Sequence, residues 1–170
     1  MKPVRATRLC IFALLVLSVT GCGYELVREK GVFGGAITTL SLPIFKNITY
    51  EPHVSLYVTD AFSQELMGTG LFKLGREGTD GYLEGTVRDI RIVPNALSGT
   101  GLTIQKTIYM DLDLSLFGKD TKVIRRWTFS DNEVYRTDDI NIEDYNKRDA
   151  LRKISARMAR RFSAAILVDY

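Results

Sequence analysis

The amino-acid sequence predicts an α+β fold, a two-layer sandwich in which two helices pack on one face of a mixed sheet of four, or five, strands. Two segments, residues 52–70 and 143–168, place apolar residues at spacings of three and four, which is the period of a helix. Between them, apolar and polar residues alternate in several short segments, which is typical of strands with one buried face. Strand, helix, several antiparallel strands and helix form two layers when both helices cover the same face.

The chain opens with a segment that is typical of a bacterial export signal. Three basic residues come before any acidic one: Lys2, Arg5 and Arg8. The apolar run at residues 9–19 is too short to cross a bilayer as a helix, which takes about 20 residues. A basic start, a short apolar core and small residues behind it predict that residues 1–21 are a signal peptide, removed in the mature protein.

Cys22 is predicted to carry a lipid. Val-Thr-Gly-Cys at residues 19–22 resembles a bacterial lipobox, with a branched apolar residue, small residues at the scissile bond and a thiol for the diacylglyceryl group. A further fatty acid such as palmitate on the new amine would add the second signal that stable anchoring requires. Gly23 replaces the aspartate that often marks inner-membrane retention, which favours the outer membrane. The alternative is a conventional secretory signal with a cysteine near its end.

Removal of the signal changes the composition of the chain. Taking 21 residues from 170 leaves 149, enough for one domain with a proper core, and leaves 20 basic and 20 acidic residues. This balance gives no argument for a nucleic-acid partner. Cys10 would leave with the signal, so no internal disulfide or catalytic thiol remains. We divide the mature chain into a lipidated N-terminus and tether at residues 22–36 and one α+β domain at residues 37–170.

The first strand is expected at residues 37–45, where larger apolar residues alternate with smaller ones. Pro43 lacks a backbone donor, so the strand either lies near an edge of the sheet or ends early. The first helix follows, with Pro52 in its first turn and with Gly68 and Gly70 ending it.

Four further strands are expected, at residues 71–76, 82–93, 104–116 and 123–129. The apolar parity shifts between Val87 and Ile90, which predicts a bulge. Three residues of the last strand are expected to face the core: Val123, Trp127 and Phe129. Residues 130–146 are polar and acidic, and Asp138, Asp139, Glu143 and Asp144 among them are expected to lie in a solvated loop and at the start of the last helix. That helix carries an apolar stripe (Leu151, Ile154, Met158, Phe162, Ala165) opposite basic residues (Lys153, Arg157, Arg160, Arg161).

The segment LPIFKNITYEP at residues 42–52, followed by Thr59, resembles the LPS-assembly lipoprotein LptE family, as do the GCGYEL start and the later LEGTV strand. The resemblance covers nearly the whole mature chain. It implies a non-enzymatic outer-membrane lipoprotein, anchored through Cys22, that plugs the LptD barrel, aids its assembly and binds lipopolysaccharide. Only Cys22 carries over as a functional residue. The Pro-Ile-Phe and Asn-x-Thr-x-Glu-Pro block is interpreted as a strand end and a helix start.

Family members use basic residues near the second hairpin to contact their ligand. Here five cations lie on the strands around that hairpin and could pair with lipid A phosphates: Arg88, Arg91, Lys106, Arg125 and Arg126. The loop itself, PNALSGTG at residues 94–101, contains no Lys or Arg, which departs from the family pattern. The alternative is a solvated strand face whose cations are balanced by Asp89, Asp111 and Asp113. The basic side of the last helix is expected to be solvated, with contact to anionic lipid or to an acidic barrel wall as the alternative.

The sequence indicates no enzyme, cofactor or metal site. His53 is the only histidine, and no thiol nucleophile, metal-ligand cluster or Gly-rich phosphate loop accompanies it. Two other functions stay open. A stand-alone outer-membrane lipid carrier or scaffold lipoprotein would have a wide apolar cavity and no barrel partner. A lipoprotein hydrolase would have a cleft with paired carboxylates of perturbed acidity.

Overall fold

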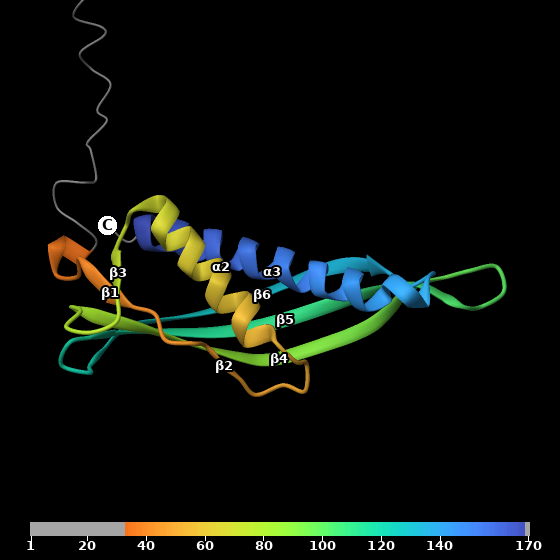
Figure 1. The fold of residues 1–170 in the computed structure, drawn as a ribbon, viewed down its shortest axis with the longest axis horizontal. Helices are drawn as coiled ribbons and strands as arrows, with labels where there is room; N and C mark the ends of the chain where they lie inside the picture. Colours follow the sequence, from red (N-terminus) through yellow and green to blue (C-terminus); the bar gives the residue numbers. More distant parts are fainter. Residues whose placement is uncertain (1–32, 169–170) are drawn as a thin grey trace, which may run out of the picture. The chain divides into compact units, whose positions relative to one another are not determined.

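The computed structural model describes residues 33–168, so the predicted signal peptide, Cys22 and most of the tether lie outside the described residues. Two helices, α2 (Val54–Thr69) and α3 (Ile140–Val168), lie side by side on one face of a twisted sheet (Figure 1). This arrangement confirms the predicted α+β two-layer fold. The sheet has six strands, slightly more than the four or five predicted.

The sheet is mixed, with three long antiparallel strands and three short ones. In chain order, after a short 3-10 helix η2 (Phe33–Gly35), the strands are β1 (Thr39–Ser41), β2 (Lys46–Asn47), β3 (Lys73–Gly75), β4 (Gly81–Leu97), β5 (Thr103–Gly118) and β6 (Val123–Arg136). They lie in the order β3-β1-β4-β5-β6, and β2 pairs with β4 further along. Strands β1 and β2 run parallel to β4, whereas β4, β5 and β6 form an antiparallel meander with β6 at one edge.

The first expected strand, at residues 37–45, is shorter in the structure, and the first helix begins and ends at other residues than its sequence signals indicated. Strand β1 ends at Ser41, before Pro43, and lies between β3 and β4 rather than at an edge. Helix α2 begins after His53, which has a left-handed backbone with φ 63°, so Pro52 precedes the helix instead of forming its first turn. Gly70, with φ 64°, caps the end, and Gly68 lies inside the helix. The helix therefore ends at the glycine that has the left-handed conformation.

The hairpin between β4 and β5 is longer than predicted. Strand β4 continues to Leu97 and β5 begins at Thr103, so the loop contains only residues 98–102. The predicted bulge is confirmed by a register shift between Val87 and Asp89.

Strand β6 runs to Arg136, so the predicted end of this strand at Phe129 was wrong. Asp131 and Glu133 share the helix-facing side of the strand with the buried Phe129 and Tyr135, which hid the strand pattern. The expectation for Val123 was also wrong. Its side chain is 40% exposed because the register shift between Leu116 and Phe117 pairs Val123 with Phe117, on the face of the sheet that carries no helix.

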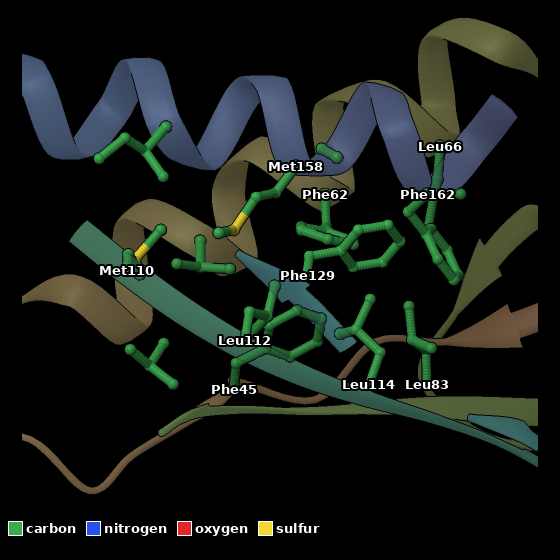
Figure 2. Close-up of a cluster of buried hydrophobic side chains, with 14 of the residues drawn as sticks. Phe45, Phe62, Leu66, Leu83, Met110, Leu112, Leu114, Phe129, Met158 and Phe162 are labelled. Atoms are coloured by element: carbon green, nitrogen blue, oxygen red, sulfur yellow. The ribbon is translucent and has the colours of Figure 1, made fainter. Parts of the chain in front are cut away.

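The core lies between the helices and the sheet. Even-numbered residues of β5 from Ile108 to Leu116 are buried there (Figure 2). Of the predicted stripe of α3, Leu151, Ile154, Met158 and Phe162 are buried, whereas Ala165 is only partly buried and Ile166 is buried beside it. An aromatic series crosses this core: the ring centroids of Phe45 and Phe62 are 5.2 Å apart, and those of Phe62 and Phe162 are 5.4 Å apart. Such edge-on and tilted ring pairs stabilise the fold beyond the area that they bury.

The LPIFKNITYEP block is structural, as interpreted. The side-chain oxygen of Thr59 on α2 accepts the N–H of Phe45 at 2.9 Å and donates to the carbonyl of Ser55 at 2.6 Å. Asn47 bridges the turn, since its side chain donates to the carbonyl of Glu51 at 2.7 Å and accepts from the N–H of Thr49 at 2.9 Å. These bonds hold the strand end and the approach to α2 in one conformation.

Asp80 ties the turn before β4 to the start of β1. One of its carboxylate oxygens accepts both the N–H and the hydroxyl of Thr39 and of Thr38, at 2.8–3.0 Å. The hydrogen bonds from Thr39, followed by those from Thr38, hold the pKa of Asp80 far below the usual range of a carboxyl group. The charged form of Asp80 is therefore favoured in the folded protein.

We expect this link to make folding stability depend on pH. Because the pKa of Asp80 is lowered on folding, its contribution is complete above the unfolded pKa of about 3.9 and is lost as the pH falls through that value toward the folded pKa. Asp80→Asn should lower the urea midpoint near pH 7, and the gap to the wild type should narrow below about pH 4. Asp60→Asn is the control, since Asp60 makes no hydrogen bond or ion pair within the described residues. A gap that is constant with pH would contradict this role.

Candidate binding surface

The sheet offers two different surfaces to a ligand. Successive side chains of a strand point to opposite faces, and both helices cover the same one (Figure 1). The odd-numbered residues of β5 from Gln105 to Phe117, with their register partners on β4 and β6, therefore lie on the helix-free face.

The structure does not bring the five predicted cations into one cluster. Arg88, Arg91 and Arg126 lie on the helix-free face, and Lys106 and Arg125 lie on the helix-bearing face. Even within one face they are spread along the strands. Arg91 is level with Tyr109 and Arg126 with Ser115, so about 20 Å of strand separates them at roughly 3.4 Å per residue.

Arg88 lies in a balanced polar network. Its guanidinium is 3.7 Å from the carboxylate of Asp113 and 3.9 Å from that of Asp111. The hydroxyl of Thr128 donates to Asp113 at 2.8 Å and that of Ser130 donates to Asp111. This part of the face matches the solvated, charge-balanced alternative, in which each exposed ion pair contributes about 1 kcal/mol at most.

Arg91 is the cation best placed to meet an amphiphile. Its side chain is 63% exposed, pairs with Asp89 at 3.0 Å and lies over the ring of Tyr109, 5.4 Å from the centroid. On the same face, the neighbouring set of register partners places Thr107 between the exposed Val93 of β4 and the exposed Val134 of β6. A guanidinium beside aromatic and aliphatic surface suits a ligand that carries both an anionic group and hydrocarbon.

Lys106 is engaged in the fold. Its ammonium group is 2.6 Å from Glu143 and so joins β5 to α3, and each of the two side chains is 30% exposed. Nearby, Glu51 pairs with Lys147 of α3 at 2.8 Å. Burial, and then the charges of Glu143 and Glu51, raise the pKa of Tyr135 to about 12, so its phenol stays neutral at physiological pH.

Arg125 and Arg126 follow each other on β6 and point to opposite faces. Arg125 lies over the ring of Trp127, 5.7 Å from its centroid, on the face that carries α3. Arg126 is exposed on the helix-free face. The two residues therefore cannot act on one ligand group together.

The sequence reasoning missed the role of Arg157. We expected a solvated helix face, yet its guanidinium contacts Asp131 at 2.8 Å and Glu133 at 2.7 Å and donates to the carbonyl of Asn132 at 2.6 Å. Hydrogen bonds to Asp131, and then those to Glu133, raise the pKa of Arg157 above its ordinary value, although burial opposes this. Alternating acids at residues 131 and 133 were the signal that an arginine would face them.

Other features of the described residues bear on function. A groove of about 460 Å³ between α2 and α3 is lined mostly by polar and charged side chains, among them Asp60, Arg152 and Arg160. Within residues 33–168, no three metal-binding side chains gather to form a cation site. Neither described helix has the length and hydrophobicity needed to cross a membrane.

The fold and this surface define an α+β domain in which two helices cover a long antiparallel ribbon whose other face is open. The sequence profile of the LptE family, described as lipopolysaccharide-assembly, matches residues 37–166. The chain belongs to this family of non-enzymatic lipoproteins of the Gram-negative envelope, which act in lipopolysaccharide assembly.

Solved structures of lipoproteins share the fold. Rare lipoprotein B from Shewanella oneidensis is similar with a TM-score of 0.55 and 12% identity, over 78% of this chain and 96% of that one. A minor lipoprotein from Acinetobacter baumannii has a TM-score of 0.54 and 15% identity, over 78% of this chain and 92% of that one. At these identities the likeness concerns the fold alone. A search of curated proteins found no match.

Proposed function

We propose that this lipoprotein is anchored in the outer membrane through Cys22, partners and plugs the LptD barrel, and helps to assemble lipopolysaccharide at the outer membrane. The observation that carries the proposal is the family match over residues 37–166, which covers the whole sheet, α2, and α3 up to its last two residues. The lipobox at residues 19–22 supports the membrane anchor. A barrel partner is what separates this function from that of a stand-alone lipid carrier or scaffold.

Co-purification tests the partnership. We expect the tagged full-length protein, solubilised from outer membranes in mild detergent, to be recovered with one large barrel protein in a fixed ratio. A tagged, unrelated outer-membrane lipoprotein, prepared in parallel, controls for incomplete solubilisation. Recovery of the tagged protein without a large barrel partner would favour the carrier alternative and contradict the proposal.

We also propose that lipopolysaccharide is bound on the helix-free face near Arg91. Arg88, Lys106, Arg125 and Arg126 remain candidates, but each contacts protein groups or lies away from the hairpin. Arg91 combines high exposure with a neighbouring aromatic ring and two exposed valines. These groups support contact with both the phosphates and the acyl chains of lipid A.

Arg91→Glu is expected to weaken lipopolysaccharide binding about tenfold or more, because a hydrogen bond to a charged group contributes roughly 1.5–3 kcal/mol. Binding to immobilised lipopolysaccharide measures this, with Lys119→Glu in the β5–β6 turn as the matched charge reversal. Reversal of Lys106 is a poorer probe, because Lys106 and Glu143 are each only 30% exposed and their ion pair joins β5 to α3, so the change would also disturb the fold. Equal affinity of the Arg91 variant and the wild type would move the site elsewhere.

A further inference from the structure

Strand β6 is an edge strand, and α3 caps only one half of it. Three side chains of α3 donate to backbone carbonyls of the strand: Arg161 to Ser130 at 3.0 Å, Arg157 to Asn132 at 2.6 Å and Asn146 to Arg136 at 3.1 Å. The N–H of Asn132 is also satisfied, by the carboxylate of Asp131 at 2.8 Å. These even-numbered residues therefore turn their backbone groups away from β5.

The other half of the edge is open. Outward and inward backbone groups alternate along an antiparallel strand, and the register with β5 is regular from Arg125 to Arg136. Arg126 and Thr128 thus share the outward orientation of Ser130 and Asn132. No residue within 33–168 forms a hydrogen bond with the outward N–H or carbonyl of either. A row of unpaired backbone groups of this kind is a template for another strand.

A groove runs beside the open half of the edge, between β6 and the last turns of α3. It has a volume of about 430 Å³, and its lining is aromatic and aliphatic with two guanidinium groups and no carboxylate: Arg125, Trp127, Phe129, Arg161, Ala164, Ala165 and Val168. The guanidinium of Arg161 lies over the ring of Phe129, 5.4 Å from its centroid. A side chain entering the groove from the edge would therefore meet apolar surface and positive charge.

The charge of the open half differs from that of the capped half. Around the capped half, Asp131 and Glu133 neutralise Arg157. Arg126 is exposed and makes no ion pair with any described residue, and Arg161 bonds to a carbonyl rather than to a carboxylate. Self-pairing of two copies at this edge would bring like charges across from each other, which is destabilising. Acidic side chains on a partner strand would be attracted here.

We propose that the open half of the β6 edge, at Arg126 and Thr128, binds an extended acidic segment of a partner protein by strand addition. Main-chain hydrogen bonds to these two residues would provide the affinity, and alternate side chains would provide the selectivity. Side chains on the groove side would be apolar or acidic, toward Trp127 and Arg161. Those on the opposite side would be acidic, toward Arg126.

A synthetic peptide tests this with the full-length protein in detergent. The probe is a fluorescent peptide of about eight residues that alternates valine with aspartate or glutamate. A second peptide carries N-methyl groups on the alternate amides that would face β6, and a third has lysine at every acidic position. Fluorescence anisotropy should show binding of the first peptide and at least about tenfold weaker binding of the other two.

Protein variants locate the site. Thr128→Pro removes an outward N–H that the pairing with β5 does not use, and Arg126→Glu reverses the free charge; each should weaken peptide binding at least about tenfold. Val134→Pro, at an outward position in the other half of the edge, should change the affinity for the peptide less than about twofold. Circular dichroism checks that each variant is folded. If Thr128→Pro unfolds the chain, the methylated peptide and the Arg126→Glu variant still test whether the peptide binds this edge by strand addition.

Several results would overturn the proposal. A dimer in sedimentation that Thr128→Pro abolishes would mean that the edge binds a second copy of this chain instead of an acidic partner segment. Equal binding of the methylated peptide would mean that backbone pairing plays no part. No binding of the acidic peptide, or equal binding by Val134→Pro and Thr128→Pro variants, would also refute strand addition at this half of the edge.

Discussion

Replacing Gly85 with valine is expected to destabilise the protein by about 3 kcal/mol or more, since overpacking a core costs typically 1–3 kcal/mol and more where neighbours cannot move. A Cβ atom at Gly85 would lie 2.4 Å from a carbon of the Phe45 ring. Phe45 is buried, its ring packs edge-on against Phe62, and Thr59 holds its backbone N–H. The ring therefore has little freedom to withdraw, and urea unfolding should show a large fall in the midpoint.

Gly68→Ala is the matched control for the Gly85 variant. No atom lies within 4 Å of a Cβ built at Gly68, and the residue is inside α2, so alanine should raise stability by about 0.5–1 kcal/mol. Phe45→Leu combined with Gly85→Val should recover part of the lost stability, because the two residues contact each other. An unchanged midpoint for Gly85→Val alone would show that β4 and the Phe45 segment can separate without cost.

Cys22→Ala is expected to abolish lipid attachment completely. The thiol of Cys22 is the only atom in the predicted lipobox that can take the diacylglyceryl group, so its loss removes both the lipid and the anchor. Growth with a labelled fatty acid followed by immunoprecipitation measures the modification, and fractionation of the envelope measures the attachment. After removal of the signal, no other thiol is expected to substitute for it.

Cys10→Ala provides the control, because Cys10 lies in the apolar core of the predicted signal and should leave with it. This variant should be labelled and anchored like the wild type. A Cys22→Ala protein that still carries the labelled fatty acid would show that the lipobox interpretation is wrong. A mature protein that begins elsewhere and is never labelled would support the conventional secretory signal instead.

Local periodicity was enough to predict most of the fold. The apolar stripe of α3 and the alternation of β5 repeat every few residues, so each can be recognised without knowing its neighbours. The bulge after Val87 was visible for the same reason, since a change of parity is a local signal. Strand β6 beyond Phe129 was missed because its inward positions carry Asp131 and Glu133, and the residue that neutralises them, Arg157, lies 24 or more residues away.

The candidate site, too, could be predicted only in part from the sequence. The sequence showed which kinds of residue to expect: basic groups near the second hairpin, a lipobox cysteine, and the LPIFKNITYEP block that resembles the LptE family. The tertiary structure alone decided which cations are engaged, as Lys106 is by Glu143, and which are exposed, as Arg91 is. It also revealed that one half of the β6 edge is capped and the other open. Periodicity and motifs are short-range properties of the chain, whereas ion pairs and strand edges depend on residues that only folding brings together.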